Sequence, residues 1–435
     1  MRNGKLIPAV LVLSHEEQLH RLARSCPPAV SVALVAGDPC FDRILLSRGL
    51  RASYRDGFGL TEGQRLVVIS STWGPKSLYG QHPELPVALA EQLPLDEYRI
   101  ALVLHPNIWY GHSRGQLDSW LAGCARAGIT IIAPEEGWRA ALVAADLVVG
   151  DYGSVSFYAV AQGAPLLLAA HPAGIVDAES PIAALLATAP RLDPKRGLRE
   201  QVEECVSDYD AERYRSISAQ TTSAPGRAAQ LLRSAIYREL RLSEPAAPAS
   251  TSTVPLPAIT IAPIGAQLVG VAFPDGMDLA EVRRFPAEVL YRTTGTGRGR
   301  YLVVGTDQPR QLWLERADAL LRDTPSRTRD WMSTSLAALP GCLVAAEPDR
   351  AGRWLVGDRA GRVVRFDADD QAAGRTSAFG ACCAAVVCAW SAAGLRWAEL
   401  PKRLTITRNG LTVRVSVAVQ DPTGRADDVV APPVR

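Results

Sequence analysis

A chain of 435 residues, 47% hydrophobic and 21% charged, has the composition of a globular protein with two or three domains. Its formal net charge of +2 gives no electrostatic reason to expect binding to nucleic acid or to a charged membrane surface. The eight cysteines form no CxxC pair or other metal-ligand spacing. We therefore expect reduced thiols in a cytoplasmic protein, with no disulfide framework, no metal site and no cofactor.

Two apolar stretches could be mistaken for membrane or export segments. Residues 1–13 have a basic start and a short apolar run, but they pass directly into a polar helical pattern without a small-residue cleavage site. We predict a strand at 7–13 and a helix at 15–24. The uncharged window between Arg375 and Arg396 is rich in Ala, Cys, Gly and Ser, which favours a buried element over a transmembrane segment.

Regular alternation of strands and helices dominates the chain up to residue 240. A strand at 32–36, a helix at 41–48 and a polar connector at 51–63 come first. The further predicted strands are 66–70, 100–104, 129–132, 147–149 and 165–169. The further predicted helices are 86–92, 114–127, 136–145, 154–162, 180–187, 196–205 and 225–240. Continuous apolar strands between amphipathic helices predict an α/β fold with a parallel, doubly wound sheet covered on both faces.

The composition changes at residues 241–257, where Pro, Ser, Thr and Ala predominate, so we predict a linker that packs against no core. A separate α+β domain is predicted at 258–420, followed by a disordered tail at 421–435. Its predicted strands are 259–261, 267–273, 288–293, 301–304, 353–356, 362–366 and a hairpin of 404–407 with 411–419, and its predicted helices are 277–284 and 314–322. Asn409-Gly410 is the turn signal of that hairpin. The Gly-rich run 294–300 opens no helix, which favours a hairpin loop over a phosphate loop.

Residues with polar or flexible chemistry follow four successive strands of the predicted sheet, where ligands bind in open parallel sheets. They are Thr72 after the first strand, His105 after the second, Glu135 and Glu136 after the third, and Asp151, Gly153 and Ser154 after the fourth. A helix is predicted to begin at Ser154, and the free N–H groups of a helix N-terminus attract phosphate. The pattern therefore predicts a phosphate site at this edge.

Each of these residues also has a simpler interpretation. Ser154 could do no more than cap its helix. His105 could be an ordinary strand-end histidine, and Asp151 could form an Asx turn. Glu135 or Glu136 could simply favour the positive end of the following helix. Because the four strand ends meet at one edge, their convergence argues for a site more strongly than any single residue does.

Residues 145–158 (ADLVVGDYGSVSFY) resemble a signature of the CDP-glycerol glycerophosphotransferases, teichoic-acid enzymes with the two-lobed GT-B glycosyltransferase fold. Three upstream features occur in the order of that family: the stretch 35–45 (VAGDPCFDRIL), the loop 70–74 (SSTWG) and the pair His105-Pro106. The resemblance covers roughly residues 31–175. It departs from the family at Gly74, Gly150 and Gly153, which stand where the family has arginine, threonine and serine.

The resemblance implies a transferase that moves a glycerophosphate or sugar group from a nucleotide-activated donor, such as CDP-glycerol, to a cell-envelope polymer acceptor. It implies that Ser154, Gly153, Asp151 and Thr72 bind the donor phosphates, in a domain at 63–240 like the C-terminal lobe of GT-B enzymes. His105 would be the catalytic group, as acid/base or electrostatic stabiliser. Glu135 or Glu136 would meet the ribose of the nucleotide.

The same resemblance implies a cytoplasmic protein, with peripheral contact to the inner membrane face as a further expectation. A GT-B enzyme has a whole N-terminal lobe with a His-Gly motif, whereas here only the residues before Val35 precede the resembling stretch, and no His-Gly pair occurs. We therefore expect residues 1–62 to be a remnant of that lobe, or the chain to start late. The alternative function is a non-catalytic scaffold that binds a nucleotide or a protein, and a UDP-GlcNAc 2-epimerase-like enzyme is a third option.

Overall fold

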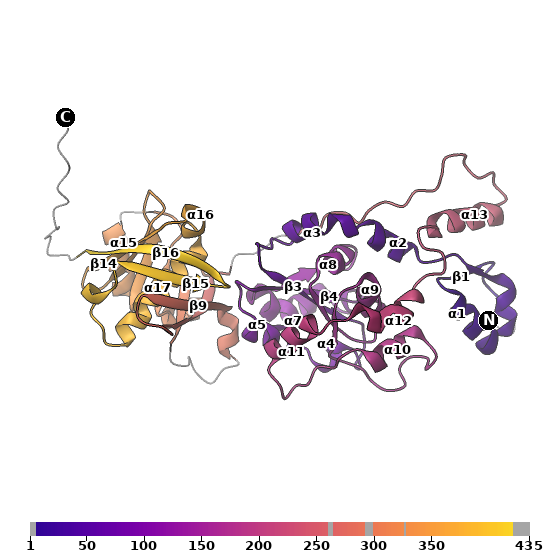
Figure 1. Cartoon of the computed structure of the whole chain (residues 1–435), viewed down its shortest axis with the longest axis horizontal. Coiled ribbons are helices and arrows are strands. Elements are labelled where there is room, and N and C mark those ends of the chain that lie inside the picture. Colours follow the sequence, from indigo (N-terminus) through magenta and orange to yellow (C-terminus); the bar gives the residue numbers. More distant parts are fainter. Residues whose placement is uncertain (1–5, 260–263, 292–298, 326–327, 421–435) are drawn as a thin grey trace. The chain divides into compact units, whose positions relative to one another are not determined.

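The computed structural model describes residues 6–259, 264–291, 299–325 and 328–420. The chain divides into two compact units, with the boundary near residue 261. Each unit has its own sheet and its own core (Figure 1). Among the helices of the described residues, none has the length and apolar character needed to cross a bilayer.

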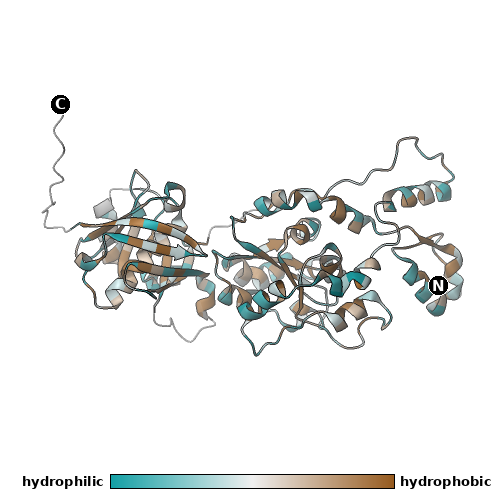
Figure 2. Cartoon of the chain, viewed as in Figure 1, coloured by the Kyte–Doolittle hydropathy of each residue, from teal (hydrophilic) through white to brown (hydrophobic). Residues whose placement is uncertain are grey.

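A five-stranded parallel sheet organises the first unit, as the alternation of strands and helices predicts. Its strands are β3 (Arg65–Ser71), β4 (Tyr98–Leu104), β5 (Thr130–Ile132), β6 (Leu147–Gly150) and β7 (Leu166–Leu168). Their spatial order is β5-β4-β3-β6-β7, and every neighbouring pair is parallel. The strands are strongly apolar because both faces of the sheet are buried (Figure 2).

Helices cover both faces of this sheet (Figure 1). The helices α2 (Pro39–Leu46), α3 (Arg51–Gly57), α8 (Trp138–Ala144) and α9 (Ser154–Gln162) share one core with the sheet. The helix α5 (Leu85–Gln92) contacts β4, and α11 (Leu198–Ser207) contacts α5, β6 and β7. The other helical segments of the unit are α4 (Leu78–Gln81), α6 (Pro106–Gly111), α7 (Arg114–Arg126), α10 (Pro181–Thr188), α12 (Arg215–Ala219), α13 (Ala228–Leu240) and the 3-10 turns η1 (Pro27–Val32), η2 (Arg48–Leu50) and η3 (Ala211–Tyr214).

The predicted boundary at residue 62 does not separate two cores. Tyr54 and Phe58, from α3 and the residue after it, are fully buried together with Val68 of β3 and Val148 of β6. The helices α2 and α3 therefore pack as part of the domain that contains the sheet.

The order of the strands creates a crevice at one edge of the sheet. From β3 the chain proceeds to β4 and β5 on one side, and then returns to β6 and β7 on the other side. The connections that leave the neighbouring strands β3 and β6 therefore run in opposite directions. Such a switch point in a parallel sheet leaves a gap beyond the carboxyl ends of the strands, and ligands bind there.

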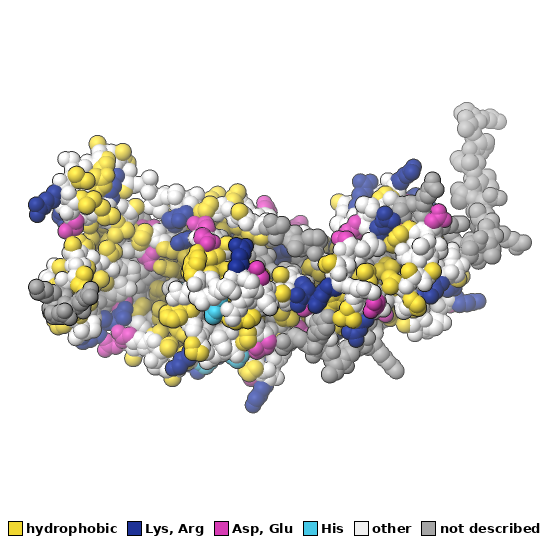
Figure 3. Space-filling model, turned by 180° about the vertical axis from the view of Figure 1, so that it is seen from behind, with side chains coloured by type: hydrophobic (Ala, Val, Ile, Leu, Met, Phe, Trp, Pro, Cys, Tyr) yellow, Lys and Arg dark blue, Asp and Glu magenta, His cyan; other side chains and the backbone are white. Residues whose placement is uncertain are grey.

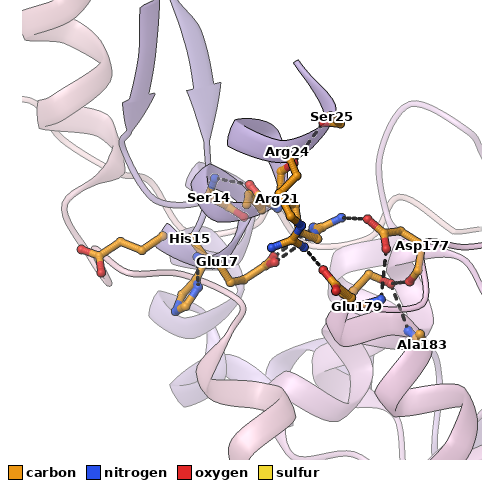
Figure 4. Close-up of polar contacts among 12 residues, drawn as sticks. Ser14, His15, Glu17, Arg21, Arg24, Ser25, Asp177, Glu179 and Ala183 are labelled. Carbon is orange, nitrogen blue, oxygen red and sulfur yellow. Dashed lines mark hydrogen bonds and ion pairs between the residues drawn. The ribbon is translucent and has the colours of Figure 1, made fainter. Parts of the chain in front are cut away.

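The N-terminal segment forms a small element of its own. The strands β1 (Leu11–Leu13) and β2 (Ala33–Val35) pair in a separate two-stranded parallel sheet, and α1 (Glu16–Ser25) between them has no buried residue. Ion pairs connect α1 to the loop before α10: Arg21, which also bonds Glu17 of the same helix at 2.7 Å, bonds Asp177 at 3.2 Å, and Arg24 pairs with Glu179 (Figure 4). Exposed ion pairs contribute only about 0–1 kcal/mol each, and hydrogen bonds between Ser223 and the residues Ser14 and Glu16 attach the segment as well.

The Pro- and Ser-rich segment 241–257 differs from its prediction, because one of its residues does pack against a core. Val254 is 2% exposed and belongs to the core of the first unit. Its N–H donates to the Ser47 hydroxyl at 2.8 Å, and its carbonyl accepts from the Tyr54 hydroxyl at 2.6 Å. Average composition does not reveal such a single buried residue.

The second unit is built on a closed barrel, which the described residues form from nine strands in the order β10-β11-β12-β13-β14-β16-β15-β9-β8. The strands are β8 (Ala266–Ala272), β9 (Leu279–Pro286), β10 (Arg300–Gly305), β11 (Ala319–Leu321), β12 (Val344–Pro348), β13 (Trp354–Asp358), β14 (Val363–Ala368), β15 (Arg403–Arg408) and β16 (Leu411–Gln420). Its helical segments are η4 (Ala287–Tyr291), α14 (Gln311–Arg316), α15 (Thr328–Ala338), α16 (Gln371–Gly374), α17 (Ser377–Ala392) and η5 (Trp397–Glu399).

The helix α17 fills the core of this barrel, so the apolar window near 375–396 is a buried element, as predicted. Its residues Ala381–Cys388 have essentially no accessible surface, which fits a helix that is apolar on all sides. Trp354 of β13 lies directly against it: a Cβ added at Gly380 would be 2.4 Å from the indole ring. The Trp354 Nε1–H donates to the Gly374 carbonyl at 2.9 Å.

Three predicted elements of the second unit are wrong. The segment 277–284, predicted as a helix, contains most of the strand β9, in which buried Ala280 and Val282 alternate with exposed Glu281 and Arg283. The segment 288–293, predicted as a strand, begins within the 3-10 turn η4. The segment 314–322, predicted as a single helix, contains the end of α14 and then the strand β11.

The predicted hairpin is confirmed, because β15 and β16 pair antiparallel across Asn409 and Gly410, which have φ values of 51° and 69°. Three other expectations fall wholly or partly outside the described residues: the strand 259–261, the Gly-rich run 294–300 and the tail 421–435.

Candidate functional site

A cavity of about 330 Å³ lies at the switch point of the first unit. Its walls come from the ends of β3 and β4, from the start of α9 and from α8. The lining residues are Cys40, Ser70, Ser71, Thr72, Val103, Leu104, His105, Pro106, Ala133, Pro134, Trp138, Gly153, Ser154, Val155 and Tyr158. Four predicted site residues therefore meet here: Thr72, His105, Gly153 and Ser154. Asp151, Glu135 and Glu136 are not among the lining residues.

The N-terminus of α9 opens onto this cavity. Gly153 is the N-cap residue, in an extended conformation, and no side chain caps the helix. Ser154 is therefore the first residue of the helix and does not cap it, so the simpler interpretation of Ser154 is wrong. The first N–H groups of an α-helix have no partner within the helix, so those at the start of α9 are available to an anion in the cavity.

His105 presents a neutral imidazole to the same cavity. The residue is the N-cap of α6, and its Nδ1 accepts a hydrogen bond from the Asn107 N–H at 3.1 Å. Its ring centre is 6.2 Å from that of Trp73. Burial lowers the pKa of His105, and the charge of Asp151 opposes that shift in part. An acceptor Nδ1 places the proton on Nε2, so His105 acts as a hydrogen-bond donor through Nε2.

We expect ¹⁵N NMR of the full chain at pH 7.5 to show His105 as the Nε2–H tautomer, with a pKa below the ordinary 6.5. All six histidines lie within residues 1–171, and Figure 3 shows histidine side chains reaching the surface of the first unit. His105→Gln assigns the signal by removing it. Since a lowered pKa disfavours protonation in the folded state, the stabilising contribution of His105 falls as the pH drops below 6.5. A pKa above 6.5, or an Nδ1–H tautomer, would contradict this geometry.

Asp151 connects the loops that line the cavity, although it does not line the cavity itself. It is 1% exposed, and its carboxylate accepts from the N–H groups of Thr72 at 2.9 Å, Leu78 at 3.0 Å and Gly153 at 3.0 Å. Burial raises the pKa of Asp151, and these three N–H groups act in the opposite direction. The bond to Gly153 is the Asx-turn contact that the simpler interpretation expects. The carboxylate thus positions both loops and does not face the space that a phosphate would occupy.

The two predicted ribose-binding glutamates are engaged with neighbours. Glu135 accepts from the Tyr110 hydroxyl at 2.8 Å. Glu136 bonds Arg139 at 3.0 Å. Neither carboxylate lines the cavity.

The aromatic wall of the cavity is not predicted from the strand ends, because it comes from helices. Tyr158 is stacked on Trp138 with ring centres 6.1 Å apart, and its hydroxyl donates to Asp38 at 2.6 Å. The Arg139 guanidinium lies over the Trp138 ring, 4.4 Å from its centre. The spacing of Ser154 and Tyr158 is a usable signal, since residues i and i+4 share one face of a helix.

Gly150 leaves room for a serine of α9. A Cβ at position 150 would be 2.2 Å from the Ser156 hydroxyl oxygen, which is buried and has no hydrogen-bond partner among the described residues. A threonine at this position, as in the resembling family, would require Ser156 to move. The glycine at position 150 therefore goes together with the present position of the Ser156 side chain.

No family model and no curated protein matches the chain. Among solved structures, the wall teichoic acid polymerase TagF is similar, with 16% identity, a TM-score of 0.40, and coverage of 54% of this chain and 58% of that one. A UDP-GlcNAc 2-epimerase from Neisseria meningitidis bound to UDP-GlcNAc has 15% identity and a TM-score of 0.33, covering 53% and 61%. The Anabaena protein HepE in complex with UDP and glucose has 16% identity and a TM-score of 0.29, covering 54% and 63%.

The chain spans less than two thirds of the length of each of these structures. Identities and TM-scores this low identify neither a substrate nor an activity. We therefore argue function from the cavity and its residues.

Proposed function

We propose that the first unit binds the diphosphate of a nucleotide-activated donor in the switch-point cavity and transfers the donor's glycerophosphate or sugar group to an acceptor. One observation carries the proposal: the open N-terminus of α9, the hydroxyl-bearing residues Thr72 and Ser154, and the imidazole of His105 line a single cavity. The resemblance of residues 31–175 to the CDP-glycerol glycerophosphotransferases supports CDP-glycerol as the first donor to test. A cell-envelope polymer is the acceptor that the same resemblance implies.

The phosphate contacts offered here are uncharged. Among the residues that line the cavity there is neither arginine nor lysine. Attraction of a phosphate by the start of α9 is worth about 0.3–1 kcal/mol, and up to about 2 kcal/mol when partly buried. Hydroxyl and imidazole donors add to it, and Trp138 and Tyr158 contribute apolar aromatic surface to the same cavity. We therefore expect modest affinity that depends on several weak donors together.

His105 is suited to stabilise charge in this reaction. Its Nε2–H can donate to an oxygen of the transferred or leaving phosphate, where negative charge develops as the bond to the leaving group breaks. Its Nδ1 is already occupied by the Asn107 N–H. Electrostatic stabilisation is thus the role that the hydrogen bonding of His105 supports, in preference to general base.

Calorimetric titration of the full chain with CDP-glycerol, CDP, CMP and UDP-GlcNAc tests the proposal. Ser154→Ala and His105→Ala each remove one donor to a charged group, so each should weaken CDP binding about tenfold or more. The matched controls are Ser207→Ala and His20→Ala, both at exposed positions outside the cavity lining. Unchanged CDP affinity in both cavity variants would overturn the site.

A non-catalytic nucleotide-binding scaffold is the second candidate. Glycine at positions 74 and 153, where the resembling family has arginine and serine, favours it because both changes remove phosphate contacts. Binding of CDP without release of CMP from CDP-glycerol, in the presence of a hydroxylated acceptor, would support the scaffold over the transferase.

A further inference from the structure

A second and larger cavity, of about 570 Å³, lies in the first unit beside the switch-point cavity. It is an open pocket lined by the segment 74–83 that follows β3, by α6 and the residue after it, and by α7. We call it the α6–α7 pocket. Pro75, Tyr79, Ile108, His112 and Trp120 supply its apolar and aromatic walls.

The lining of the α6–α7 pocket is suited to hydrocarbon. His112 and Trp120 meet edge to face with ring centres 4.8 Å apart, and Trp120 remains 46% exposed. Burial raises the pKa of Tyr79 to about 12, which reflects apolar surroundings. The Ser77 hydroxyl is already satisfied, because it donates to the Gly74 carbonyl at 2.7 Å and accepts from the Gly80 N–H at 3.0 Å. Among the lining residues there is no Asp, Glu, Lys or Arg.

The two cavities are lined by neighbouring residues of the same two segments. Thr72 lines the switch-point cavity and Gly74 lines the α6–α7 pocket, with Trp73 between them. His105 lines the first and Ile108 the second, one turn apart at the start of α6. The rings of Trp73 and His105 are 6.2 Å apart.

One buried carboxylate ties the two cavities together. Asp151 binds the N–H of Thr72, in the wall of the switch-point cavity, and the N–H of Leu78, within the segment that lines the α6–α7 pocket. The relative placement of the two cavities is therefore fixed by hydrogen bonds to a residue that is itself 1% exposed.

We propose that the α6–α7 pocket binds a hydrocarbon group of the acceptor, so that the hydroxyl-bearing part of the same molecule lies at His105 beside the donor. The proposal rests on the function proposed above for the donor's part of the reaction. An apolar cavity next to a polar one is complementary to an amphiphile, with a hydrocarbon part and a hydroxylated head. Pockets of this size that are mostly apolar, with few polar groups, are typical small-molecule sites.

The probe for this test is n-octyl β-D-glucopyranoside below its critical micelle concentration, titrated into the full chain by calorimetry. We expect it to bind, and we expect glucose, which has no hydrocarbon part, not to bind. Trp120→Ala removes a large aromatic ring from the pocket and should weaken octyl glucoside binding about five- to tenfold. His112→Ala removes a smaller ring and should weaken the binding less. The matched control is Tyr110→Ala, an aromatic residue of α6 that is 70% exposed and does not line the pocket.

CDP affinity, measured on the same variants, separates the two proposals. Unchanged CDP binding together with weakened octyl glucoside binding in Trp120→Ala supports the pocket. Absence of octyl glucoside binding, or equal binding in Trp120→Ala and the unsubstituted chain, overturns it whatever the CDP result. If octyl glucoside binds in a Trp120-dependent way and no nucleotide binds, the hydrocarbon site stands, while its role as an acceptor site and the proposed transferase are overturned.

Discussion

Asp151→Ala is expected to lower the free energy of unfolding of the first unit by at least about 3 kcal/mol and to abolish nucleotide binding. The substitution deprives the N–H groups of Thr72, Leu78 and Gly153 of their acceptor. A hydrogen bond to a charged group is worth about 1.5–3 kcal/mol, and each buried donor left unsatisfied costs about 1–3 kcal/mol. Urea unfolding of the full chain, followed by circular dichroism, measures the change, and calorimetry with CDP measures binding.

The control for this experiment is Asp118→Ala, an exposed aspartate on α7, which should change the free energy of unfolding by no more than about 0.5 kcal/mol. Asp151→Asn should fall between the two, since an amide retains one acceptor oxygen but points an NH₂ group at one of the N–H donors. An Asp151→Ala chain that unfolds at the urea concentration of the unsubstituted chain would refute the idea that this carboxylate holds the loops.

Trp354→Ala is expected to lower the free energy of unfolding of the second unit by about 3–5 kcal/mol, the usual cost of truncating a large buried aromatic side chain. Trp354 is 1% exposed, it packs against Gly380 of α17, and its indole N–H bonds the Gly374 carbonyl. Gly380→Ala should also destabilise, by about 1–3 kcal/mol, because the added methyl overlaps the indole ring.

The double variant Trp354→Ala/Gly380→Ala tests the contact itself. Removing the indole makes space for the new methyl, so the two substitutions together should cost less than the sum of their separate effects. Urea unfolding of the full chain measures all three variants, with Trp73→Ala, an exposed tryptophan of the first unit, as the control for the second-unit transition. Strict additivity would show that Gly380 and the indole do not compete for the same volume.

The parallel sheet of the first unit could be predicted because each of its strands is a continuous apolar run between helical patterns. Such runs mark strands that are buried on both faces, and the structure places β3, β4 and β6 within two residues of the predicted bounds at either end. The position of the switch point could not be predicted in this way. It depends on β6 pairing with β3 instead of following β5, and that pairing is set across the sheet and not along the chain.

Residues at strand ends were the predictable part of the candidate site. Thr72 and His105 follow their strands directly, and Ser154 follows β6 after a turn of three residues, so they reach one edge together. Asp151 also follows a strand, but its carboxylate accepts hydrogen bonds from three backbone N–H groups. Its orientation depends on the conformation of the neighbouring loop and could not be predicted from the strand pattern. Trp138 and Tyr158 lie on helices, where a position next to the cavity depends on how α8 and α9 pack.

Prediction was weaker in the second unit because some of its strands carry charged residues among the apolar ones. β9 carries Glu281, Arg283 and Arg284 between apolar residues, and its alternation is brief enough to resemble a helical pattern. β11 has only the residues Ala319–Leu321, too few for any periodicity. The closure of the barrel by the parallel pairing of β9 with β15 joins segments far apart in the chain, beyond the reach of local pattern.

That closure has a consequence for the order of events during synthesis. Leu279 of β9 pairs with Thr405 of β15, and α17, which fills the interior, is translated after β14. Until residues through β16 have left the ribosome, the inward apolar side chains of the earlier strands have neither their helix nor their closing neighbours to pack against. Topologies dominated by such distant contacts fold slowly, and their incomplete chains expose aggregation-prone surface. The second unit therefore needs protection from aggregation until β16 has been synthesised.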